Sequence, residues 1–375
     1  MRRIPVAPRA DWRERVAAKG LVFHTTDEGQ SYWDESVHYE FSAREIDVLE
    51  QATLALDELC LQAVQHVVDH DLWERFLIAP GFVDWIRSSW DHDEHTIYGR
   101  FDLLFDGAGS PKLLEYNADT PTALLEAAVI QWYWLQDVEP AVDQFNSLHE
   151  RLVEIWQIIA ATGADSVAFA SVAGHTEDFL TVAYLRDTAH QAGLKTQYVP
   201  IDRLGWSQAR RVFVDEQERP LPLVFKLYPW EWLMHEEFGP HLLGATTKWL
   251  EPPWKALLSN KAILPTLWEL FPNHPNLLPA SFEPLPGVQV RKPMLGREGA
   301  NVTILDGDRV RFGTDGDYGA GPFVYQQFQA PPRFDGHTPV IGSWLVNGYA
   351  CGIGIREDAE LITTNTSRFV PHLFR

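Results

Sequence analysis

The segment 96–120, TIYGRFDLLFDGAGSPKLLEYNADT, most restricts the folds open to this chain. Two runs of alternating apolar and polar residues flank a glycine-rich turn, and this pattern predicts a β-hairpin. With the turn centred in DGAGSP, Asp102 lies opposite Glu115 and Arg100 lies opposite Asn117. Because side chains alternate faces along a strand, all four then project from one side of the hairpin. A slip of one residue in register would destroy this arrangement.

Two carboxylates directly opposite each other repel, so the predicted pairing requires a positive group between them. Magnesium prefers one or two carboxylates completed by water and substrate phosphates, and Asp102, Glu115 and Asn117 offer such a set. Arg100 can hold a phosphate or a carboxylate in bidentate fashion. A solvated hairpin face with an Arg–Asp pair explains the same spacing.

Two lysines and a glycine-containing loop form a second candidate site. Lys261 begins the apolar stretch NKAILPTLW, and Lys292 ends a β-like run just before the loop GREGAN at 296–301. Backbone N–H groups of such a loop can cradle a phosphate. The loop is not a P-loop, because Gly-Lys-Ser/Thr is missing and a strand is expected to follow it. An ordinary hairpin turn is the alternative.

VYQQF at 324–328 predicts a short strand in which Gln326 and Gln327 face opposite sides. The backbone of such a segment can pair with the edge of an adenine ring. A plain edge strand fits the same pattern.

The segment PVIGSWLVNGYACGIGIRED predicts a second hairpin, with Asn347–Gly348 as a type I′ turn between two alternating apolar runs. Arg356 stands at the far end of its second strand. From there the guanidinium can reach a ligand, or it can form a surface ion pair with Glu357 or Asp358.

The rest of the chain predicts a mixture of helices and strands. Apolar spacing of helical period runs from 43 to 76 and recurs from 124 to 161. The short apolar run 166–172 is followed by a helical pattern that ends at Gly193 and by an extended segment, which predicts a β-α-β unit. Beyond Pro252, strands separated by turns are expected.

Charge limits the partners that the protein can bind. The 375 residues carry a formal net charge of −21, from 31 Lys plus Arg and 52 Asp plus Glu. Such a surface repels nucleic acid and attracts cations, so we expect a cationic amine substrate and no nucleic-acid partner. No sequence pattern specifies an oligomeric state.

Cysteine content and hydropathy indicate a cytoplasmic protein. Cys60 and Cys351 are far apart and form no CxxC pattern, which argues against a disulfide framework or a zinc cluster. The basic N-terminus is not followed by an apolar run of signal-peptide length. No segment reaches the roughly 18 uninterrupted apolar residues of a membrane helix.

Taken together, YGRFD, LLEYNADTPTALLEA, NKAILPTLW, KPMLGREGAN, VYQQF and GSWLVNGYACGIGIRED resemble the glutathionylspermidine synthase C-terminal domain family, in order across about residues 90 to 375. The resemblance implies an α+β protein with an ATP-grasp fold. Two lobes would enclose ATP beside an additional small α/β lobe of the pre-ATP-grasp kind.

This resemblance also implies how the chain is divided. Residues 1–375 would form a single synthetase unit. The region 1–95 would be mainly helical, 96–250 would hold the metal-binding hairpin and the small α/β lobe, and 251–375 would form the ATP-binding lobe.

Roles for individual residues follow from the matched motifs. Asp102, Glu115 and Asn117 would bind magnesium, and Arg100 and Arg356 would stabilise the transferring phosphoryl group and an acyl phosphate. The ATP-binding residues would be Lys261, Lys292, Gly296, Gly299, Asn301, Gln326 and Gln327, with the 296–301 loop over the phosphates.

The implied activity is an ATP- and magnesium-dependent carboxylate–amine ligase, which would join a peptide or glutathione-like acid to a polyamine-like amine. The carboxylate would attack the terminal phosphate of ATP, and the amine would displace phosphate from the resulting acyl phosphate. Thr120 would contact substrate, and Glu177 or Asp178 would bind or deprotonate the amine. A helical surface pair explains the last two residues as well.

Two departures from the family and two rival functions remain. The amidase domain of the bifunctional members is not expected here, so Cys60 is interpreted as a buried helical residue. The substrate-facing segment 225–233, FKLYPWEWL, differs in character from the glutathionylspermidine enzymes. The rivals are a non-catalytic ATP-grasp-like nucleotide-binding protein and a metal-dependent hydrolase that uses His92 and His95.

Overall fold

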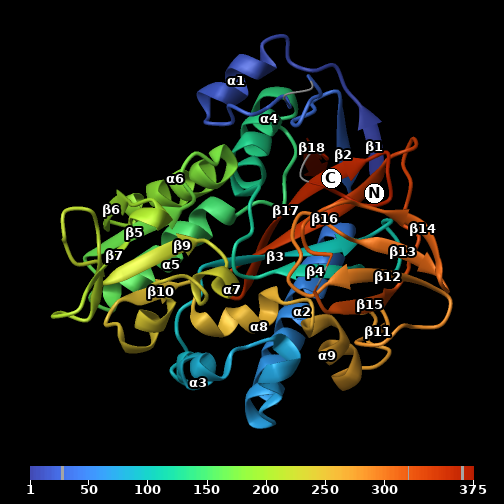
Figure 1. Ribbon diagram of the computed structural model, residues 1–375. Coiled ribbons are helices and arrows are strands. Elements are labelled where there is room, and N and C mark those ends of the chain that lie inside the picture. The colour runs from blue at the N-terminus through green and yellow to red at the C-terminus, as the bar shows by residue number, and fades with distance from the viewer. Residues whose placement is uncertain (27–28, 320, 365–366) are drawn as a thin grey trace.

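The computed structural model describes residues 1–26, 29–319, 321–364 and 367–375. Figure 1 shows an antiparallel sheet in the middle of the molecule, a parallel α/β unit on one side of it and a second antiparallel sheet on the other. The long helix α2 (Ala43–Asp69) packs against the central sheet. The α+β class expected from the sequence is confirmed.

The central sheet combines the two predicted hairpins. Its strand order is β18-β17-β16-β3-β4, with every neighbouring pair antiparallel. The bounds are β3 Tyr98–Leu104, β4 Lys112–Asn117, β16 Thr338–Val346, β17 Tyr349–Asp358 and β18 Arg368–Val370. Asn347 and Gly348 join β16 to β17 with φ values of 49° and 76°, as the predicted type I′ turn requires.

The second antiparallel sheet carries the glycine-containing loop. Its strand order is β11-β15-β12-β13-β14. The bounds are β11 Ala280–Ser281, β12 Val288–Pro293, β13 Thr303–Asp306, β14 Arg309–Gly313 and β15 Phe323–Gln327. The predicted VYQQF strand is therefore an inner strand between β11 and β12, and the plain edge strand that the sequence left open is ruled out.

The third sheet is parallel and contains the predicted β-α-β unit. Its order is β10-β9-β5-β6, and α6 (Thr176–Gln191) connects β5 to β6. The strands are β5 Ser166–Ser171, β6 Lys195–Tyr198, β9 Leu223–Leu227 and β10 Lys248–Leu250. α5 (Leu148–Ala161) packs against α6, and β7 (Gly205–Ser207) pairs with β8 (Val212–Val214).

A small sheet joins the two ends of the chain. β2 (Val37–Phe41) pairs with β1 (Arg2–Pro5) on one side and with β19 (His372–Phe374) on the other. Figure 1 shows both termini in this part of the molecule. The N-terminal region that was expected to be mainly helical thus also contributes two strands.

The remaining helices are short and connect or flank the sheets. They are α1 Trp12–Ala18, α3 Val83–Asp91, α4 Gln131–Val138, α7 Trp230–Leu233, α8 Ala256–Ser259 and α9 Ile263–Leu270. A π-helical turn, Glu126–Ile130, precedes α4. The 3₁₀ turns are Leu72–Phe76, Pro80–Phe82, Ile201–Arg203, Gly239–Gly244 and Pro253–Lys255.

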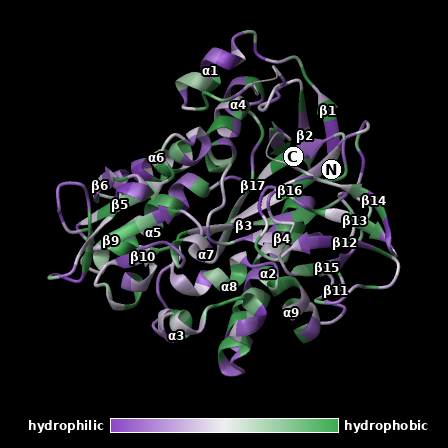
Figure 2. Cartoon of the chain, viewed as in Figure 1, coloured by the Kyte–Doolittle hydropathy of each residue, from purple (hydrophilic) through white to green (hydrophobic). Residues whose placement is uncertain are grey.

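Helix α2 illustrates how the sequence pattern produces packing. It begins at a capping box, in which the Ser42 side chain accepts from the Glu45 backbone and Glu45 reaches back to Ser42. Hydrophobic and hydrophilic bands alternate along it in Figure 2, and Leu49, Leu56 and Val64 are fully buried. Within the described ranges, no helix is long and apolar enough to cross a membrane.

Strand pairing crosses the segment boundary expected at residue 250. β16, from the proposed ATP-binding segment, pairs with the hairpin strand β3 of the preceding segment on one side and with β17 on the other. The two segments therefore share one sheet, because the edge of β3 that does not pair with β4 pairs with β16, more than 200 residues later in the chain.

Candidate active site

The hairpin register predicted from the sequence is confirmed. Arg100 pairs with Asn117 and Asp102 with Glu115 across β3 and β4. The register shifts by one residue immediately after Asp102, at a β-bulge on the turn side. All four predicted side chains line one cavity of about 480 Å³.

Cations already balance the two carboxylates of the hairpin. Arg100 Nε and Nη2 donate to the two oxygens of Asp102 at 2.7 and 3.1 Å, and Asn117 Nδ2 donates to Asp102 Oδ2 at 3.1 Å. Lys261 Nζ lies 2.6 Å from Glu115 Oε1. The sequence predicted one positive group between the two acids, whereas in the structure a separate cation pairs with each of them.

The electrostatic environment keeps Glu115 charged. Burial alone would raise the pKa of Glu115, but the ammonium groups of Lys261 and Lys292 outweigh that effect, and the pKa lies below its ordinary value. A carboxylate that stays ionised can bind a cation without first losing a proton.

Lys292 and Gln326 form a buried polar pair at the second sheet. Lys292 Nζ donates to Leu114 O and to Gln326 Oε1, both at 2.8 Å, and Gln326 Nε2 donates to Leu113 O at 2.9 Å. Burial lowers the pKa of Lys292 to about 8. Lys292, Gln326 and the exposed Gln327 all line the cavity.

Lys261 connects the hairpin to the glycine-containing loop. Its ammonium group contacts Glu115 on β4 and also donates to the backbone carbonyl of Gly296. The side chain is buried. Among the described residues that line the cavity, Lys261, Gly296 and Asn301 do not occur, whereas Gly299 does.

The 296–301 loop has an irregular backbone followed by the expected strand β13. Glu298, Gly299 and Asn301 all have positive φ, between 54° and 70°. Asn301 Oδ1 accepts from the Tyr318 backbone N–H at 2.7 Å. A Cβ on Gly299 would lie 2.6 Å from Thr363 O, so this position leaves no room for a side chain.

The predicted substrate residues are only partly brought to the cavity. Thr120 and Asp178 line it, whereas Glu177 is not among its described lining residues. Asp178 lies in the first turn of α6, with Oδ1 3.2 Å from His175 Nδ1. Burial is the main cause that raises the pKa of Asp178 to about 6.

Sequence reasoning assigned no individual role to Arg297, Glu231 or Trp232. Arg297 donates to Thr120 Oγ1 and to Glu231 Oε1, both at 2.6 Å. Its guanidinium lies 5.5 Å from the ring centroid of Trp232, and both residues line the cavity. The available signals were the arginine inside GREGAN and the unusual segment 225–233, but only the fold brings them together.

A buried anchor holds the 225–233 segment beside the hairpin. The Asp119 carboxylate, which follows β4, accepts from Lys226 Nζ at 2.6 Å and from the Trp230 backbone N–H at 3.0 Å. Asp119 and Lys226 are both fully buried. This ion pair was also missed, because neither residue stands out in its local sequence.

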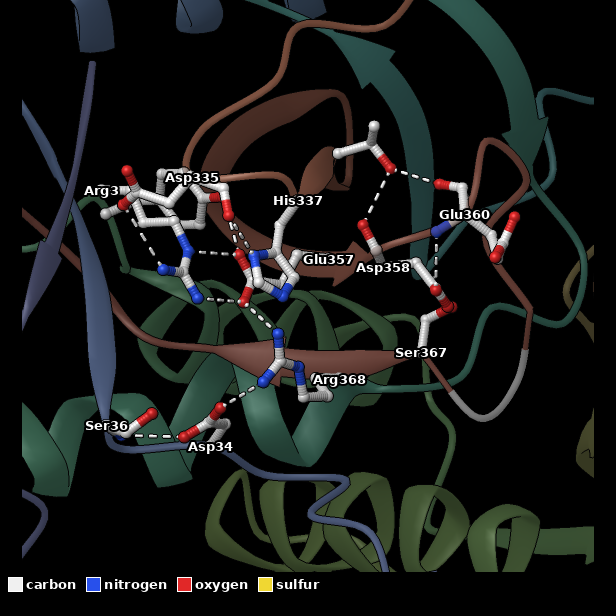
Figure 3. A network of polar contacts seen from close by, with 12 residues as sticks. Arg3, Asp34, Ser36, Asp335, His337, Glu357, Asp358, Glu360, Ser367 and Arg368 are labelled. Atoms are coloured by element: carbon white, nitrogen blue, oxygen red, sulfur yellow. Dashed lines mark hydrogen bonds and ion pairs between the residues drawn. The ribbon is translucent and has the colours of Figure 1, made fainter.

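Arg356 lines the cavity from β17. The alternative of a surface pair with Glu357 is not supported, because the Glu357 carboxylate is buried and bonded to Arg3, Arg368 and Tyr39 (Figure 3). Consecutive residues of a strand face opposite sides, so the two side chains diverge.

The residues of the hydrolase alternative lie elsewhere. His92 and His95 are exposed, and neither is among the described residues around the cavity. No group of three or more His, Cys, Asp and Glu side chains that could hold a metal occurs within the described ranges. Cys60 is buried in α2, as predicted, and burial raises the pKa of its thiol.

Comparison with a solved structure identifies the class of fold. The glutathione synthetase-like effector GSS30 from Globodera pallida, in its apo form, is similar with a TM-score of 0.64 at 11% sequence identity. The similarity covers 97% of this chain and 96% of that chain. The protein therefore has the mixed α/β fold of a glutathione synthetase-like protein.

Sequence comparisons then give the family. The family model described as "Glutathionylspermidine synthase preATP-grasp" matches residues 3–375, so the chain belongs to this family. A Haemophilus influenzae protein whose name proposes an acid–amine ligase is 41% identical, with both chains fully covered. The family resemblance predicted from the motifs is thereby confirmed.

Two larger relatives have names that describe their reactions. Trypanothione synthetase from Crithidia fasciculata is 30% identical over 84% of this chain, and the bifunctional glutathionylspermidine synthetase/amidase of Escherichia coli is 28% identical over 86%. The matched part is 53% of the first protein and 56% of the second. The chain thus corresponds to about half the length of these two relatives.

Proposed function

We propose that the protein is an ATP- and magnesium-dependent ligase that joins a carboxylate to an amine through an acyl phosphate. The observation that carries this proposal is one cavity lined by a carboxylate–amide set, three arginines and a buried lysine. The names of the relatives support the same reaction class.

The donor set suits magnesium. Asp102, Glu115 and Asn117 present oxygen ligands from one face of a rigid hairpin, and Glu115 is held in its charged form. In this structure Asp102 pairs with Arg100 and Glu115 pairs with Lys261. Both carboxylates therefore lie where a positive charge is favourable. A bound magnesium ion would neutralise the charge of the ATP phosphates.

ATP would bind at the end of the cavity between the second antiparallel sheet and the 296–301 loop. Lys292, which lines the cavity, would bind a phosphate oxygen, and the backbone N–H of Gly299 would lie over the phosphates. Lys261, Gly296 and Asn301 lie behind this lining and would hold the loop, since the Gly296 and Asn301 N–H groups donate to Pro293 O and Asp315 O. Gln326 and Gln327 lie on the inner strand β15 at the cavity wall and would meet the base.

The chain's own residues mainly position groups and neutralise charge. A carboxylate oxygen of the acid substrate attacks the terminal phosphorus of ATP, and ADP leaves. The amine nitrogen then attacks the acyl carbon, phosphate leaves, and the amine loses a proton. Arg100 and Arg356 would stabilise the negative charge that accumulates on the phosphoryl and acyl oxygens.

Asp178 is the better placed of the two predicted amine residues. It lines the cavity, and its pKa of about 6 leaves it mostly ionised at pH 7 and able to accept a proton. Glu177 would add negative charge nearby and attract a cationic amine. We infer a polyamine-like amine and a peptide or glutathione-like acid, in line with the names of the relatives.

A substrate screen tests the proposal. Peptide acids, including glutathione, would be combined with polyamines in the presence of Mg·ATP, and both ADP release and the mass of an amide product would be recorded. We expect ADP release that requires both substrates in the parent protein and is lost in Glu115→Gln. Binding of ATP without turnover for any pair would favour a non-catalytic nucleotide-binding protein.

A further inference from the structure

Glu357 is the centre of a buried charged network next to the cavity (Figure 3). Its carboxylate accepts from Arg3 Nε and Nη2, both at 2.9 Å, from Arg368 Nη2 at 3.0 Å and from the Tyr39 hydroxyl at 2.8 Å. The Glu357 side chain is fully buried. Four charge-assisted hydrogen bonds therefore fix its position.

Arg3 comes from the opposite end of the chain. It lies on β1, in the small terminal sheet, and reaches across to β17 in the central sheet with a bidentate contact. Its side chain is only 9% exposed. The neighbouring Arg2 faces the other way and pairs with Glu40, with its side chain 69% exposed. These two adjacent arginines thus have different surroundings on one strand.

Strand geometry connects this network to the cavity. Arg356 immediately precedes Glu357 on β17 and lines the cavity from the opposite face. A strand that rotates or slips must move both side chains together. The bonds at Glu357 therefore also hold the backbone that directs Arg356 toward the cavity.

Through Arg368 the network also reaches the strand that follows one wall of the cavity. Arg368 lies on β18, and the connection from β17 to β18 contributes Leu361, Ile362, Thr363 and Thr364 to the cavity lining. Asp358 ties the two ends of this connection, since it accepts from the Glu360 backbone N–H at 3.0 Å and from Ser367 Oγ at 2.7 Å. Asp34 accepts from Arg368 Nη1 at 2.9 Å.

We propose that Arg3 and Glu357 are positioning residues, through which the N-terminal strand holds Arg356 and the 361–364 wall in place for phosphoryl transfer. This inference rests on the proposed ligase function. It predicts that a side chain near the start of the chain, outside the cavity lining, controls turnover.

Hydrogen exchange tests the structural connection without any turnover. Arg3→Met removes the bidentate contact, and Arg2→Met is the matched control on the same strand. We expect amides of residues 353–358 and 361–364 to exchange about tenfold faster in Arg3→Met, because Glu357 loses two of its bonds. Arg2→Met should exchange like the parent. Equal exchange in the two variants would overturn the connection.

Kinetics separates positioning from simple stabilisation. At a temperature well below melting, Arg3→Met should lower kcat for ADP release by about tenfold or more and change the KM for ATP much less, since Arg356 would act on the transferring group. Arg3→Lys, which keeps the charge, should recover part of the loss and replaces Arg3→Met if that variant does not fold.

The opposite kinetic result would overturn the proposal. If Arg3→Met, or Arg3→Lys in its place, melts lower than the parent but retains parental kcat and KM, the network only stabilises the fold. A parent protein with no turnover would contradict the ligase function itself, whereas the exchange measurement would still decide whether β1 is connected to the cavity wall.

Discussion

Lys292 is the residue that we expect to contribute most to nucleotide binding in the cavity. Its ammonium group donates to a backbone carbonyl and to Gln326, and burial lowers its pKa to about 8. Within the described ranges, no carboxylate lies within ion-pair distance of it. A buried cation of this kind is poorly compensated, so an incoming phosphate would be its strongest partner.

Replacing Lys292 should therefore weaken nucleotide binding. We expect Lys292→Met to reduce ATP affinity by about 1.5–3 kcal/mol, the usual contribution of a charge-assisted hydrogen bond. Lys112→Met on β4, whose ammonium group donates to Pro275 O at an exposed site, is the control. Isothermal titration with Mg·ATP measures both, and parental affinity in Lys292→Met would make Lys292 structural.

His372 makes stability depend on pH. It is fully buried, Nδ1 donates to Gln131 Oε1 at 2.8 Å, and burial lowers its pKa to about 3. The unfolded chain binds a proton on this residue below pH 6.5, whereas the folded chain does not, so stability falls as pH falls. Asp57 and Glu126, whose pKa values are raised by burial to about 6 and 7, act in the opposite direction.

The contribution of His372 can be isolated by a difference measurement. Between pH 7 and pH 5 it should remove about 2 kcal/mol of unfolding free energy from the parent. His372→Asn should be less stable at pH 7 but should lose correspondingly less on acidification. Urea unfolding at both pH values measures this, and identical losses in the two proteins would show that His372 titrates normally when folded.

At the scale of elements, the 296–301 loop meets the β17–β18 connection over the cavity. Gly299 makes this contact possible, because its φ is 70° and a Cβ would lie 2.6 Å from Thr363 O. Lys261 bonds to Gly296 at the start of the loop, and the next residue, Arg297, bonds to Thr120 and Glu231. Contacts of Gly296, Arg297 and Gly299 therefore hold the loop in place.

Two glycine variants separate backbone strain from this contact. Gly299 and Gly307 both have positive φ, but a Cβ on Gly307 meets no atom within 4 Å. Both alanine variants carry the cost of a left-handed backbone, about 1 kcal/mol. Gly299→Ala should lose about 1–3 kcal/mol more and bind Mg·ATP more weakly. Equal melting temperatures and affinities would contradict the contact.

The sequence predicted those elements whose structure depends on residues close together in the chain. The register of Asp102 and Glu115 followed from alternation and a glycine-rich turn, and the turn at Asn347–Gly348 followed from its need for positive φ. The contacts of Arg297 and Arg3 did not follow, because their partners lie tens to hundreds of residues away. Strands β1 and β2 were missed for the same reason, since their sheet is completed by β19.

At the scale of the molecule, the two ends of the chain build one structure. β16 and β17 complete the sheet that begins with the hairpin, and β19 pairs with β2. The division at residue 250 followed the order of motifs along the chain, whereas strand pairing depends on which strand edges remain unpaired after local folding. Ligand binding at the cavity should therefore stabilise the whole chain.

Mg·ATP should raise the melting temperature through linkage. At a concentration 100 times its Kd, a ligand that binds only the folded state adds about 2.7 kcal/mol. We expect a rise of at least about 3 °C with Mg·ATP at millimolar concentration. The rise should be smaller for ATP with a chelator and for Asp102→Asn. No shift with Mg·ATP would contradict nucleotide binding.

The path of the carboxylate oxygen tests the account most directly. An acid substrate found in the screen would be labelled with oxygen-18 in its carboxylate and turned over with Mg·ATP and its amine, and the released phosphate would be analysed by mass spectrometry. An acyl phosphate intermediate transfers one labelled oxygen to inorganic phosphate, with ADP as the other product, and this is the result we predict. Unlabelled phosphate, or label in AMP, would contradict activation of the acid by the terminal phosphate of ATP.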